Sequence, residues 1–441
     1  MTETARLPQY VIAGLGQTGL SCVRHLQQQS VAFKVWDTRA GFNVSEELAA
    51  QINADITCGE LPHNYWQGVT HLVLSPGIAT DLPEVAQARQ AGVSVIGDIE
   101  LFALAVRQPV IGITGSNGKT TVTLLTTHIL QQLGFNAVAA GNVGLPALDS
   151  LQQAADVTVL ELSSFQLETT RSLALWAGAI LNISADHLDR HHTLAAYSEA
   201  KQRIFDHCQV AVVNRDDSNT MPMSAVETKI ATGLNPASED FGWDAAGQTI
   251  TYNGKPLLAL ADTALVGLHN ALNIQSALAL VSVFSQDMTA AAQAVKSFKS
   301  APHRCTKIAD VACVSFIDDS KATNIGATEA ALQGLAGSVT GKLILIAGGD
   351  AKGADLSELA ASLTEHVDVV IALGKDGQVL SDIAEQGYYV ESLECAVQQA
   401  FLLAKPGDTV LLSPACASLD MFNNYQHRAE VFQQAVKELS A

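Results

Sequence analysis

Long hydrophobic segments are absent from the 441-residue chain, which has no run of about 18 consecutive apolar residues. This absence argues against a helix that crosses a membrane. The N-terminal sequence MTETARLPQY also lacks the basic stretch and the apolar core of an export signal. We therefore expect a cytoplasmic protein that does not insert into a membrane.

Positive charge and cysteine are both scarce. The chain has 25 Lys and Arg residues against 44 Asp and Glu residues, a net charge of −19, which argues against nucleic acid as a partner. An anionic substrate stays possible, because the few cations can converge locally. The seven cysteines are scattered without a C-x-x-C pair, which argues against a disulfide scaffold or a zinc ribbon.

The length of the chain predicts about three domains, at roughly 150 residues per domain. Strand-like apolar segments alternate with helical periodicity, and this pattern predicts an α/β fold with a largely parallel sheet in each domain. We place the domains at residues 1–97, 98–300 and 301–441.

The most informative stretch is residues 108–134, where a short apolar strand leads through a glycine-rich turn into an amphipathic helix. Backbone N–H groups in such a turn approach phosphate closely, and the helix N-terminus favours negative charge. Lys119 would reach the terminal phosphates, and Thr120 would hold Mg²⁺. The predicted nucleotide loop comprises Gly115, Ser116, Asn117, Gly118, Lys119, Thr120 and Thr121.

A second glycine turn lies in residues 10–37. It has the spacing G-x-G-x-x-G from Gly14 to Gly19, followed by Asp37, which is the dinucleotide-binding fingerprint. Taken alone it predicts NAD, with Arg39 as a further nucleotide contact. The alternative is that the glycines only allow close packing of helix on strand.

Three residues of the middle region are further candidates. Glu161 ends a strand next to the nucleotide loop, where a Mg²⁺ ligand is expected, although an exposed glutamate is the alternative. His187 lies in a histidine cluster that allows a zinc site, a solvated loop or one functional histidine, and we favour the last. Lys201 shares a helix face with apolar and aromatic residues, which allows either a lysine whose head extends to solvent or a buried lysine of lowered pKa with a chemical role.

The remaining stretches carry weaker signals. Residues 219–263 are interpreted as surface elaboration, and residues 188–192 as a loop. Asn270 and Asn273, one helical turn apart, suit a base or a phosphate as well as helix capping. The third domain should form an open parallel sheet whose first strand covers residues 311–317. Four of its strand ends carry polar turns, which indicates a ligand face.

The order of these motifs resembles the Mur ligase family, the ATP-dependent amide-bond-forming ligases of peptidoglycan synthesis. The resemblance rests on GITGSNGKT, AGNVGLPAL, LELSSFQLE, ISADHLDRH, APHR, DDSKATN, GGDAKGAD and LLSPACASLDMF. Within the family, SSFQLE, DSKATN and SPACASLD are most similar to the members that add D-glutamate. The resemblance implies a Rossmann-like N-terminal domain for the UDP-sugar, a central P-loop ATPase domain, and a Rossmann-like C-terminal domain that closes over ATP.

The resemblance also implies residue roles. UDP-N-acetylmuramoyl-L-alanine would be bound by Gln17, Thr18, Asp37, Thr38, Arg39, Gly77, Asn142, Ser163 and His187. ATP would be contacted, beyond the nucleotide loop, by Asn142, Asn273, Arg304, Asp319 and Lys321. Two Mg²⁺ ions would lie near Thr120, Glu161, His187 and Lys201, with Lys201 carbamylated. D-Glutamate would lie near Thr323, Lys352, Ser418 and Tyr425. Catalysis would fall to Lys119, Glu161, His187 and Lys201.

The chain departs from the family pattern at three places. Tyr425 replaces a phenylalanine, Gln17 replaces a more apolar residue, and His191-His192 replace an aromatic-proline pair. The alternatives to a D-glutamate ligase are a sister ligase or a folylpolyglutamate synthetase-like enzyme, an NAD-binding regulatory protein, and an ATP-gated interaction module. We expect a monomer.

Overall fold

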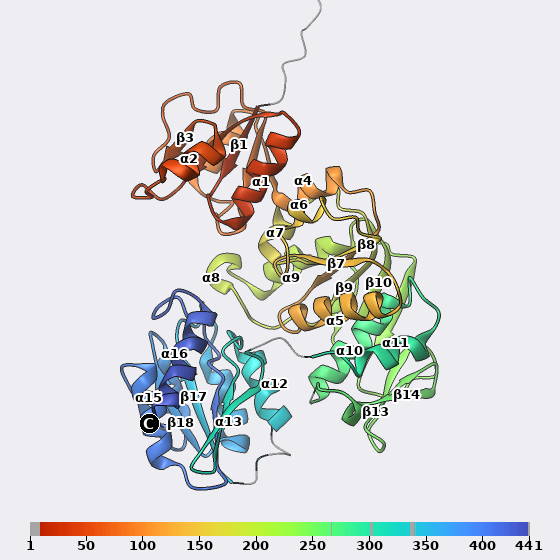
Figure 1. The fold of residues 1–441 in the computed structure, drawn as a ribbon, viewed down its shortest axis with the longest axis vertical. Coiled ribbons are helices and arrows are strands. Elements are labelled where there is room, and N and C mark those ends of the chain that lie inside the picture. The colour runs from red at the N-terminus through yellow and green to blue at the C-terminus, as the bar shows by residue number, and fades with distance from the viewer. Residues whose placement is uncertain (1–8, 266, 300–302, 336–338, 340, 440–441) are drawn as a thin grey trace, which may run out of the picture.

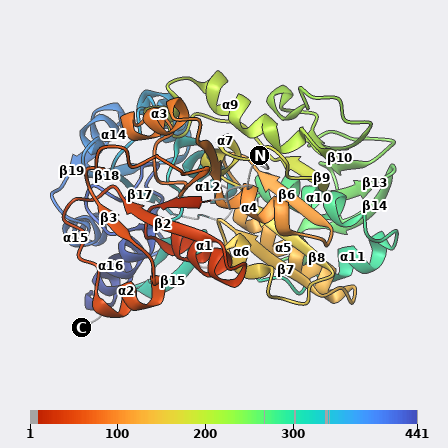
Figure 2. The same cartoon turned by 90° about the horizontal axis from the view of Figure 1, so that it is seen from above.

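A computed structural model describes residues 9–265, 267–299, 303–335, 339 and 341–439. The chain forms three lobes in sequence order, with the middle lobe beside the other two (Figure 1). Seen from above, the N-terminal lobe lies over the C-terminal lobe (Figure 2). Each lobe contains a largely parallel sheet, so the predicted α/β class is confirmed. The domain limits remain predictions, and residue 301, the expected start of the third domain, lies outside the described residues.

The N-terminal lobe has a five-stranded parallel sheet in the order β3-β2-β1-β4-β5. Its strands are β1 Gln9–Ala13, β2 Ala32–Asp37, β3 Ile56–Cys58, β4 His71–Leu74 and β5 Ser94–Gly97. Its helices are α1 Gln17–Gln28, α2 Glu46–Ile52 and α3 Pro83–Gln90. A side chain on Gly19 would overlap the carbonyl of Gly14, so the fingerprint glycines do allow close packing.

The middle lobe has a six-stranded parallel sheet in the order β11-β10-β9-β6-β8-β7. Its strands are β6 Val110–Thr114, β7 Ala137–Gly141, β8 Val157–Glu161, β9 Leu175–Ile180, β10 Cys208–Asn214 and β11 Thr228–Thr232. Its helices are α4 Asp98–Ala105, α5 Lys119–Gln132, α6 Ala147–Ser150, α7 Ser164–Glu168, α8 Leu188–His191, α9 Leu194–Gln202, α10 Leu268–Val281 and α11 Met288–Val295. The strand with the nucleotide loop, β6, lies inside the sheet and is fully buried.

A small antiparallel sheet belongs to the middle lobe as well. It comprises β12 Phe241–Asp244, β13 Thr249–Tyr252 and β14 Lys255–Ala259. Phe241, Trp243 and Ile250 are buried in the same core as helices α5 and α10. The interpretation of this stretch as surface elaboration is therefore wrong, because one face of the sheet extends the core.

The C-terminal lobe has a six-stranded sheet in the order β15-β16-β20-β17-β18-β19. Its strands are β15 Thr306–Val311, β16 Val314–Asp318, β17 Leu343–Gly348, β18 Val369–Leu373, β19 Gly387–Tyr389 and β20 Thr409–Leu412. Its helices are α12 Ile325–Leu335, α13 Ala360–His366, α14 Gly377–Ile383, α15 Leu393–Leu403 and α16 Tyr425–Glu438.

The first strand predicted for this lobe, residues 311–317, is wrong. Ala312 and Cys313 have φ angles of 48° and 63°, and they form the turn between two strands, β15 and β16. These strands are antiparallel to each other, and the remaining strands are parallel. Among the described residues, no helix has the length and apolar character needed to cross a bilayer.

Helix α5 anchors the nucleotide loop, so its core face should carry much of the stability of the middle lobe. Leu125 is fully buried on that face, whereas its neighbour Leu124 is only partly buried against the same core. We expect Leu125→Ala to lower the free energy of unfolding by about 2–5 kcal/mol, because it leaves a cavity. Leu124→Ala should cost less than about 2 kcal/mol. Denaturant unfolding measures both, and equal losses would contradict this packing.

Candidate active site

The glycine-rich turn between β6 and α5 has the geometry of a phosphate-binding loop. Gly118 caps helix α5 with a φ of 85°, and a side chain there would overlap the amide of Asn273. The Lys119 Nζ donates hydrogen bonds to the carbonyls of Gly115 (2.7 Å) and Ser116 (2.9 Å). The N-terminus of a 14-residue helix thus opens at the turn, with a lysine folded over it.

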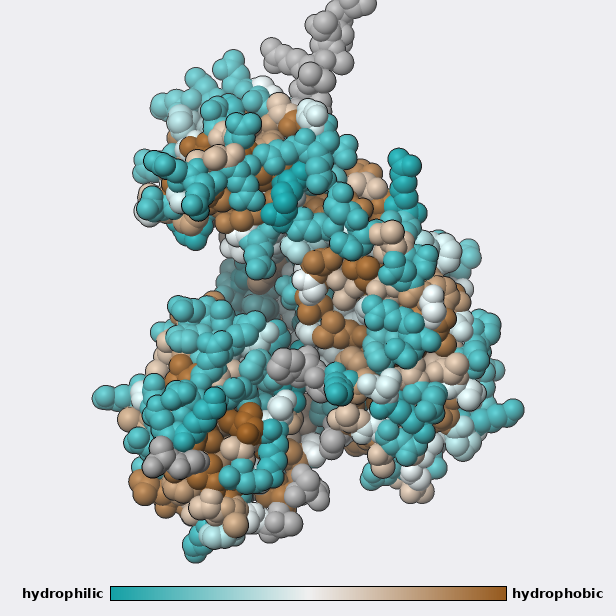
Figure 3. All heavy atoms as spheres, in the orientation of Figure 1, coloured by the Kyte–Doolittle hydropathy of each residue, from teal (hydrophilic) through white to brown (hydrophobic). Residues whose placement is uncertain are grey.

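A cavity of about 320 Å³ lies over this loop. The surface is visibly hollowed between the N-terminal and C-terminal lobes (Figure 3). All three lobes contribute residues to the lining. They are Pro76, Gly77, Ser116, Asn117, Gly118, Lys119, Thr120, Asn142, Glu161, Ser163, Ser164, Phe165, Asp186, His187, Tyr197, Lys201, Arg304, Lys321, Thr323, Asn324 and Ala327.

Glu161 has the environment of a cation ligand. It ends β8 and is only 2% exposed, so the alternative of an exposed glutamate is wrong. Its Oε1 accepts a hydrogen bond from Asn142 Nδ2 (2.7 Å), but no donor among the described residues reaches its buried Oε2. A buried carboxylate oxygen without a partner is costly, and a bound cation removes that cost. Thr120 lines the same cavity. The Glu161 carboxylate and the Thr120 hydroxyl are oxygen ligands that fit Mg²⁺, because this ion is usually bound by one or two protein side chains together with substrate phosphates.

Lys201 is buried, with 1% of its surface exposed, and does not extend to solvent. Its Nζ donates hydrogen bonds to Thr114 Oγ1 (3.3 Å) and to the Gly115 carbonyl (3.0 Å). The ammonium also lies 4.5 Å from the ring centroid of Tyr197. Burial lowers the pKa of Lys201 well below its usual value, and the nearby Lys119 adds to this. The neutral amine is therefore more accessible here than in water.

His187 has a left-handed backbone, with φ of 54°, and caps helix α8. The interpretation of residues 188–192 as a loop is wrong, since residues 188–191 form one helical turn. Burial lowers the pKa of His187 to about 4, although Asp186 opposes the shift. Within the described part of the chain, no group of three His, Cys, Asp or Glu side chains could hold a metal by itself, which disfavours the zinc alternative.

Asp186 is a site residue that the sequence analysis missed. It is buried in the middle lobe, pairs with Lys352 Nζ through Oδ1, and accepts a hydrogen bond from Asn324 Nδ2 (3.1 Å) through Oδ2. Burial raises the pKa of Asp186, but Lys352, His187 and Lys119 together outweigh this and hold the pKa below its usual value. The pair joins the middle and C-terminal lobes. The signal in the sequence that could have identified Asp186 was its position next to His187.

A second cavity, of about 440 Å³, opens on the other side of the loop. It brings together the predicted ATP contacts Asn117, Gly118, Thr121, Asn273, Arg304 and Asp319. Ala330, Ala331 and Gly334 of α12 form an apolar wall. Burial raises the pKa of Asp319 to about 7, although Ser413 Oγ donates a hydrogen bond to it (2.7 Å). An apolar slot with amide groups at its edge suits a purine base.

A third cavity, of about 500 Å³, lies at the fingerprint of the N-terminal lobe. It is lined by the predicted residues Gln17, Thr18, Asp37, Thr38, Arg39, Gly77 and Asn142. Asp37 accepts hydrogen bonds from the backbone N–H of Leu15 (2.9 Å) and from Arg39 Nε (2.8 Å). Because Gly77 and Asn142 line both this cavity and the first, the two are adjacent.

Four predicted residues, Gly115, Lys352, Ser418 and Tyr425, are not among those that line the three cavities. Lys352 reaches the first cavity through Asp186, and the Tyr425 ring centroid lies 4.0 Å from Lys321 Nζ. Ser418 is buried in the loop after β20, where its carbonyl accepts a hydrogen bond from Phe422 N (2.8 Å). Besides Asp186, sequence reasoning missed Phe165 and Tyr197, whose aromatic character alone carries no functional signal.

Three family domains match the chain in succession. They are the Mur ligase MurD-like N-terminal domain at residues 8–97, the Mur ligase middle domain at 113–281, and the Mur ligase glutamate ligase domain at 303–416. A UDP-N-acetylmuramoylalanine–D-glutamate ligase of Methylobacillus flagellatus is 46% identical, with 98% of this chain and 97% of that protein covered. The ligase of that name from Idiomarina loihiensis is 42% identical, with 97% and 96% covered.

Solved structures share the fold. The UDP-N-acetylmuramate-alanine ligase MurC of Thermotoga maritima has a TM-score of 0.62 at 18% identity and covers 98% of this chain and 99% of its own. The MurF ligase of the same organism, in complex with ADP, has a TM-score of 0.60 at 16% identity and covers 99% and 100%. The expected resemblance is confirmed over almost the whole length, and the chain belongs to the Mur ligase family.

Proposed function

We propose that the chain is an ATP-dependent ligase that joins D-glutamate to the alanyl carboxylate of UDP-N-acetylmuramoyl-L-alanine. Relatives of that name match nearly the full length at 42–46% identity. The observation that carries the proposal is the first cavity, which all three lobes line and which adjoins both other cavities. A phosphate donor in the second cavity and a sugar nucleotide in the third would meet there.

The chemistry follows from the poor reactivity of a carboxylate towards an amine. A carboxylate oxygen attacks the γ-phosphorus of ATP, the bond to the bridging oxygen breaks, and ADP leaves with that electron pair. The nitrogen of D-glutamate then attacks the acyl carbon, a proton is released, and phosphate departs as the carbon–oxygen bond breaks. Such transfers depend mainly on positioning and charge neutralisation. Lys119, Arg304 and Lys321 supply positive charge from two lobes.

Glu161 and Thr120 would hold one Mg²⁺ ion, and His187 and Lys201 would lie near a second. Bound Mg²⁺ would neutralise phosphate charge. The neutral state of His187 supports this assignment, since only a neutral imidazole binds metal. Lys201 would contribute as a carbamate: its neutral amine attacks CO₂, a nitrogen–carbon bond forms, and a proton leaves. The anionic product would suit a cavity that otherwise gathers cations.

D-Glutamate would bind near Thr323, Lys352, Ser418 and Tyr425. Thr323 lines the first cavity, and Lys352 is held at its edge by Asp186. A glutamate carboxylate would share or replace that partner of Lys352. We propose that the chain acts as a monomer. The cytoplasmic location stays a prediction.

Substrate choice is tested by phosphate release with UDP-N-acetylmuramoyl-L-alanine and a panel of D- and L-amino acids. We expect release that depends on ATP, on the sugar nucleotide and on D-glutamate. Preference for another amino acid would favour a sister or folylpolyglutamate synthetase-like ligase. ATP turnover that does not depend on the amino acid would favour an ATP-gated interaction module. Binding of a nicotinamide cofactor without binding of the sugar nucleotide would favour an NAD-binding regulatory protein.

Lys119→Ala should lower kcat by about 10³-fold or more, because the loop loses the cation nearest the transferred phosphoryl group. The fold should persist, since the hydrogen bonds of this lysine within the described residues go to its own loop. Lys229→Ala, at an exposed position on β11, is the matched control and should be active. ADP release by Lys119→Ala at a near-normal rate would reject the assignment of the loop.

Lys201→Ala should lower kcat by about 10²–10³-fold, since it removes a proposed anionic group next to the phosphates. If that group is a carbamate, added formate or acetate should restore part of the turnover. The same additives should leave Lys119→Ala inactive, which controls for a general salt effect. Failure of rescue, together with a bare ammonium in a high-resolution map, would contradict the carbamate.

A further inference from the structure

His191 occupies the centre of a row of aromatic rings beside the first cavity. Its ring stacks on Phe165, with centroids 5.5 Å apart and planes inclined by 14°. Tyr197 lies at the other end of the row from Phe165, and its ring centroid is 5.2 Å from that of His191. Phe165 also contacts His187, at 4.9 Å. His191 thus touches three residues that line the cavity, Ser164, Phe165 and Tyr197, without being among the lining residues itself.

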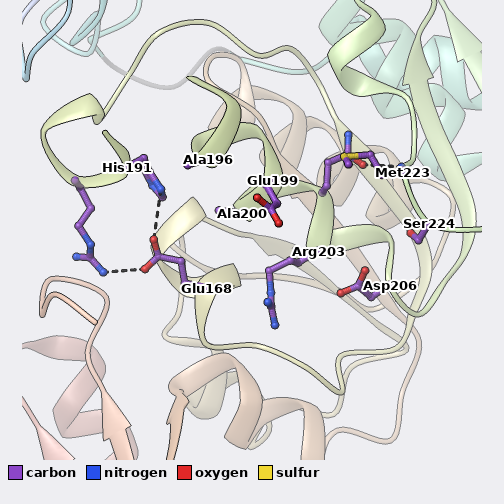
Figure 4. Close-up of a pocket in the computed structure, with 11 residues that line it drawn as sticks. Glu168, His191, Ala196, Glu199, Ala200, Arg203, Asp206, Met223 and Ser224 are labelled. Carbon is purple, nitrogen blue, oxygen red and sulfur yellow. Dashed lines mark hydrogen bonds and ion pairs between the residues drawn. The ribbon is translucent and has the colours of Figure 1, made fainter. Parts of the chain in front are cut away.

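Both ring nitrogens of His191 have polar neighbours. Nε2 lies 2.9 Å from Ser164 Oγ, and Nδ1 lies 3.4 Å from Glu168 Oε1. Glu168 also accepts a hydrogen bond from Arg190 Nη2 at 2.8 Å. Figure 4 shows the Glu168 carboxylate directed at His191, on the wall of a separate cavity of about 540 Å³ that residues of helix α9 also line. Glu168 belongs to α7, so helices α7 and α8 are joined at this point.

The environment selects one form of the ring. Burial lowers the pKa of His191 to about 4, and Arg190 adds to the shift, so the imidazole is neutral near pH 7. A neutral imidazole has one donor and one acceptor nitrogen. The carboxylate of Glu168 can only accept, which assigns the proton to Nδ1 and leaves Nε2 to accept from the Ser164 hydroxyl. A neutral histidine therefore satisfies both neighbours.

His191 lies where helices α7, α8 and α9 meet, and the ion pair of Arg190 and Glu168 also joins α8 to α7. Helix α8 is a single turn, its cap is His187, and its last residue is His191. On the other side, the Tyr197 hydroxyl accepts a hydrogen bond from Ser116 Oγ (3.2 Å) of the phosphate loop, and its ring faces Lys201. A shift of the His191 ring would therefore move side chains on both walls of the cavity.

We propose that His191 is a positioning residue of the ligase. The hydrogen bond to Ser164 holds the His191 ring in place. The ring then positions Tyr197 by direct contact, and His191 positions His187 through helix α8. The inference rests on the proposed function. A phenylalanine at this position would keep the stacking, whereas the histidine adds a polar tie to α7. The alternative is that His191 only fills space in the core.

Three variants separate these roles. His191→Phe keeps the ring and loses the bond to Ser164, and Ser164→Ala removes the partner. His192→Asn changes the exposed neighbour, whose φ of 64° asparagine tolerates, and serves as the control. We expect His191→Phe to lower kcat by about 10–100-fold with each KM changed less than about threefold, because displaced catalytic groups act in the transition state. His192→Asn should match the unaltered enzyme.

The double variant His191→Phe/Ser164→Ala should be no slower than the worse single variant, since both substitutions remove the same hydrogen bond between these two residues. In ¹⁵N-histidine spectra, the His191 signal, identified by its loss in His191→Phe, should show a neutral ring protonated at Nδ1 and should move in Ser164→Ala. This readout does not require activity. A lowered melting temperature with unchanged kcat in His191→Phe would overturn the inference. If the unaltered enzyme lacks D-glutamate-dependent turnover while the spectra behave as expected, the proposed function fails and the geometry of His191 stands.

Discussion

The structure depends on the concentration of positive charge around one small cavity in a strongly acidic chain. Lys119, Arg304 and Lys321 line it, although the net charge of the protein is −19. Burial lowers the pKa of Lys119 and that of Lys321, the latter to about 8, and the nearby Arg304 adds to both shifts. Such an arrangement is costly when empty, and a polyanion compensates for it.

The two carboxylates of the cavity, those of Asp186 and Glu161, have different partners. Asp186 is committed to Lys352 and Asn324, so it neutralises a cation of the neighbouring lobe. Glu161 keeps one carboxylate oxygen without a donor among the described residues. One acid therefore joins two lobes, and the other is available to a divalent cation. The sheets explain how both reach the site: Glu161 ends strand β8, and Asp186 follows β9, two strands that flank β6.

Sequence reasoning succeeded where the signal is local. The phosphate loop follows from glycine spacing between an apolar strand and an amphipathic helix, and the position of Lys201 on the core side of its helix follows from its apolar neighbours one helical turn away. It failed where the outcome depends on partners distant in sequence. The pair of Asp186 and Lys352 spans 166 positions, and no pattern within either segment announces it. The turn at Ala312-Cys313 lacks the glycine or asparagine that usually marks a positive φ.

The central claim is that a triphosphate and a sugar nucleotide meet over the phosphate loop. The most direct test is a crystal structure with a non-hydrolysable ATP analogue and UDP-N-acetylmuramoyl-L-alanine bound together. The account predicts the γ-phosphate beside Lys119, with its phosphorus within about 4 Å of an alanyl carboxylate oxygen. A structure that leaves either neighbouring cavity empty, or that separates the two groups in every observed arrangement of the lobes, would contradict it.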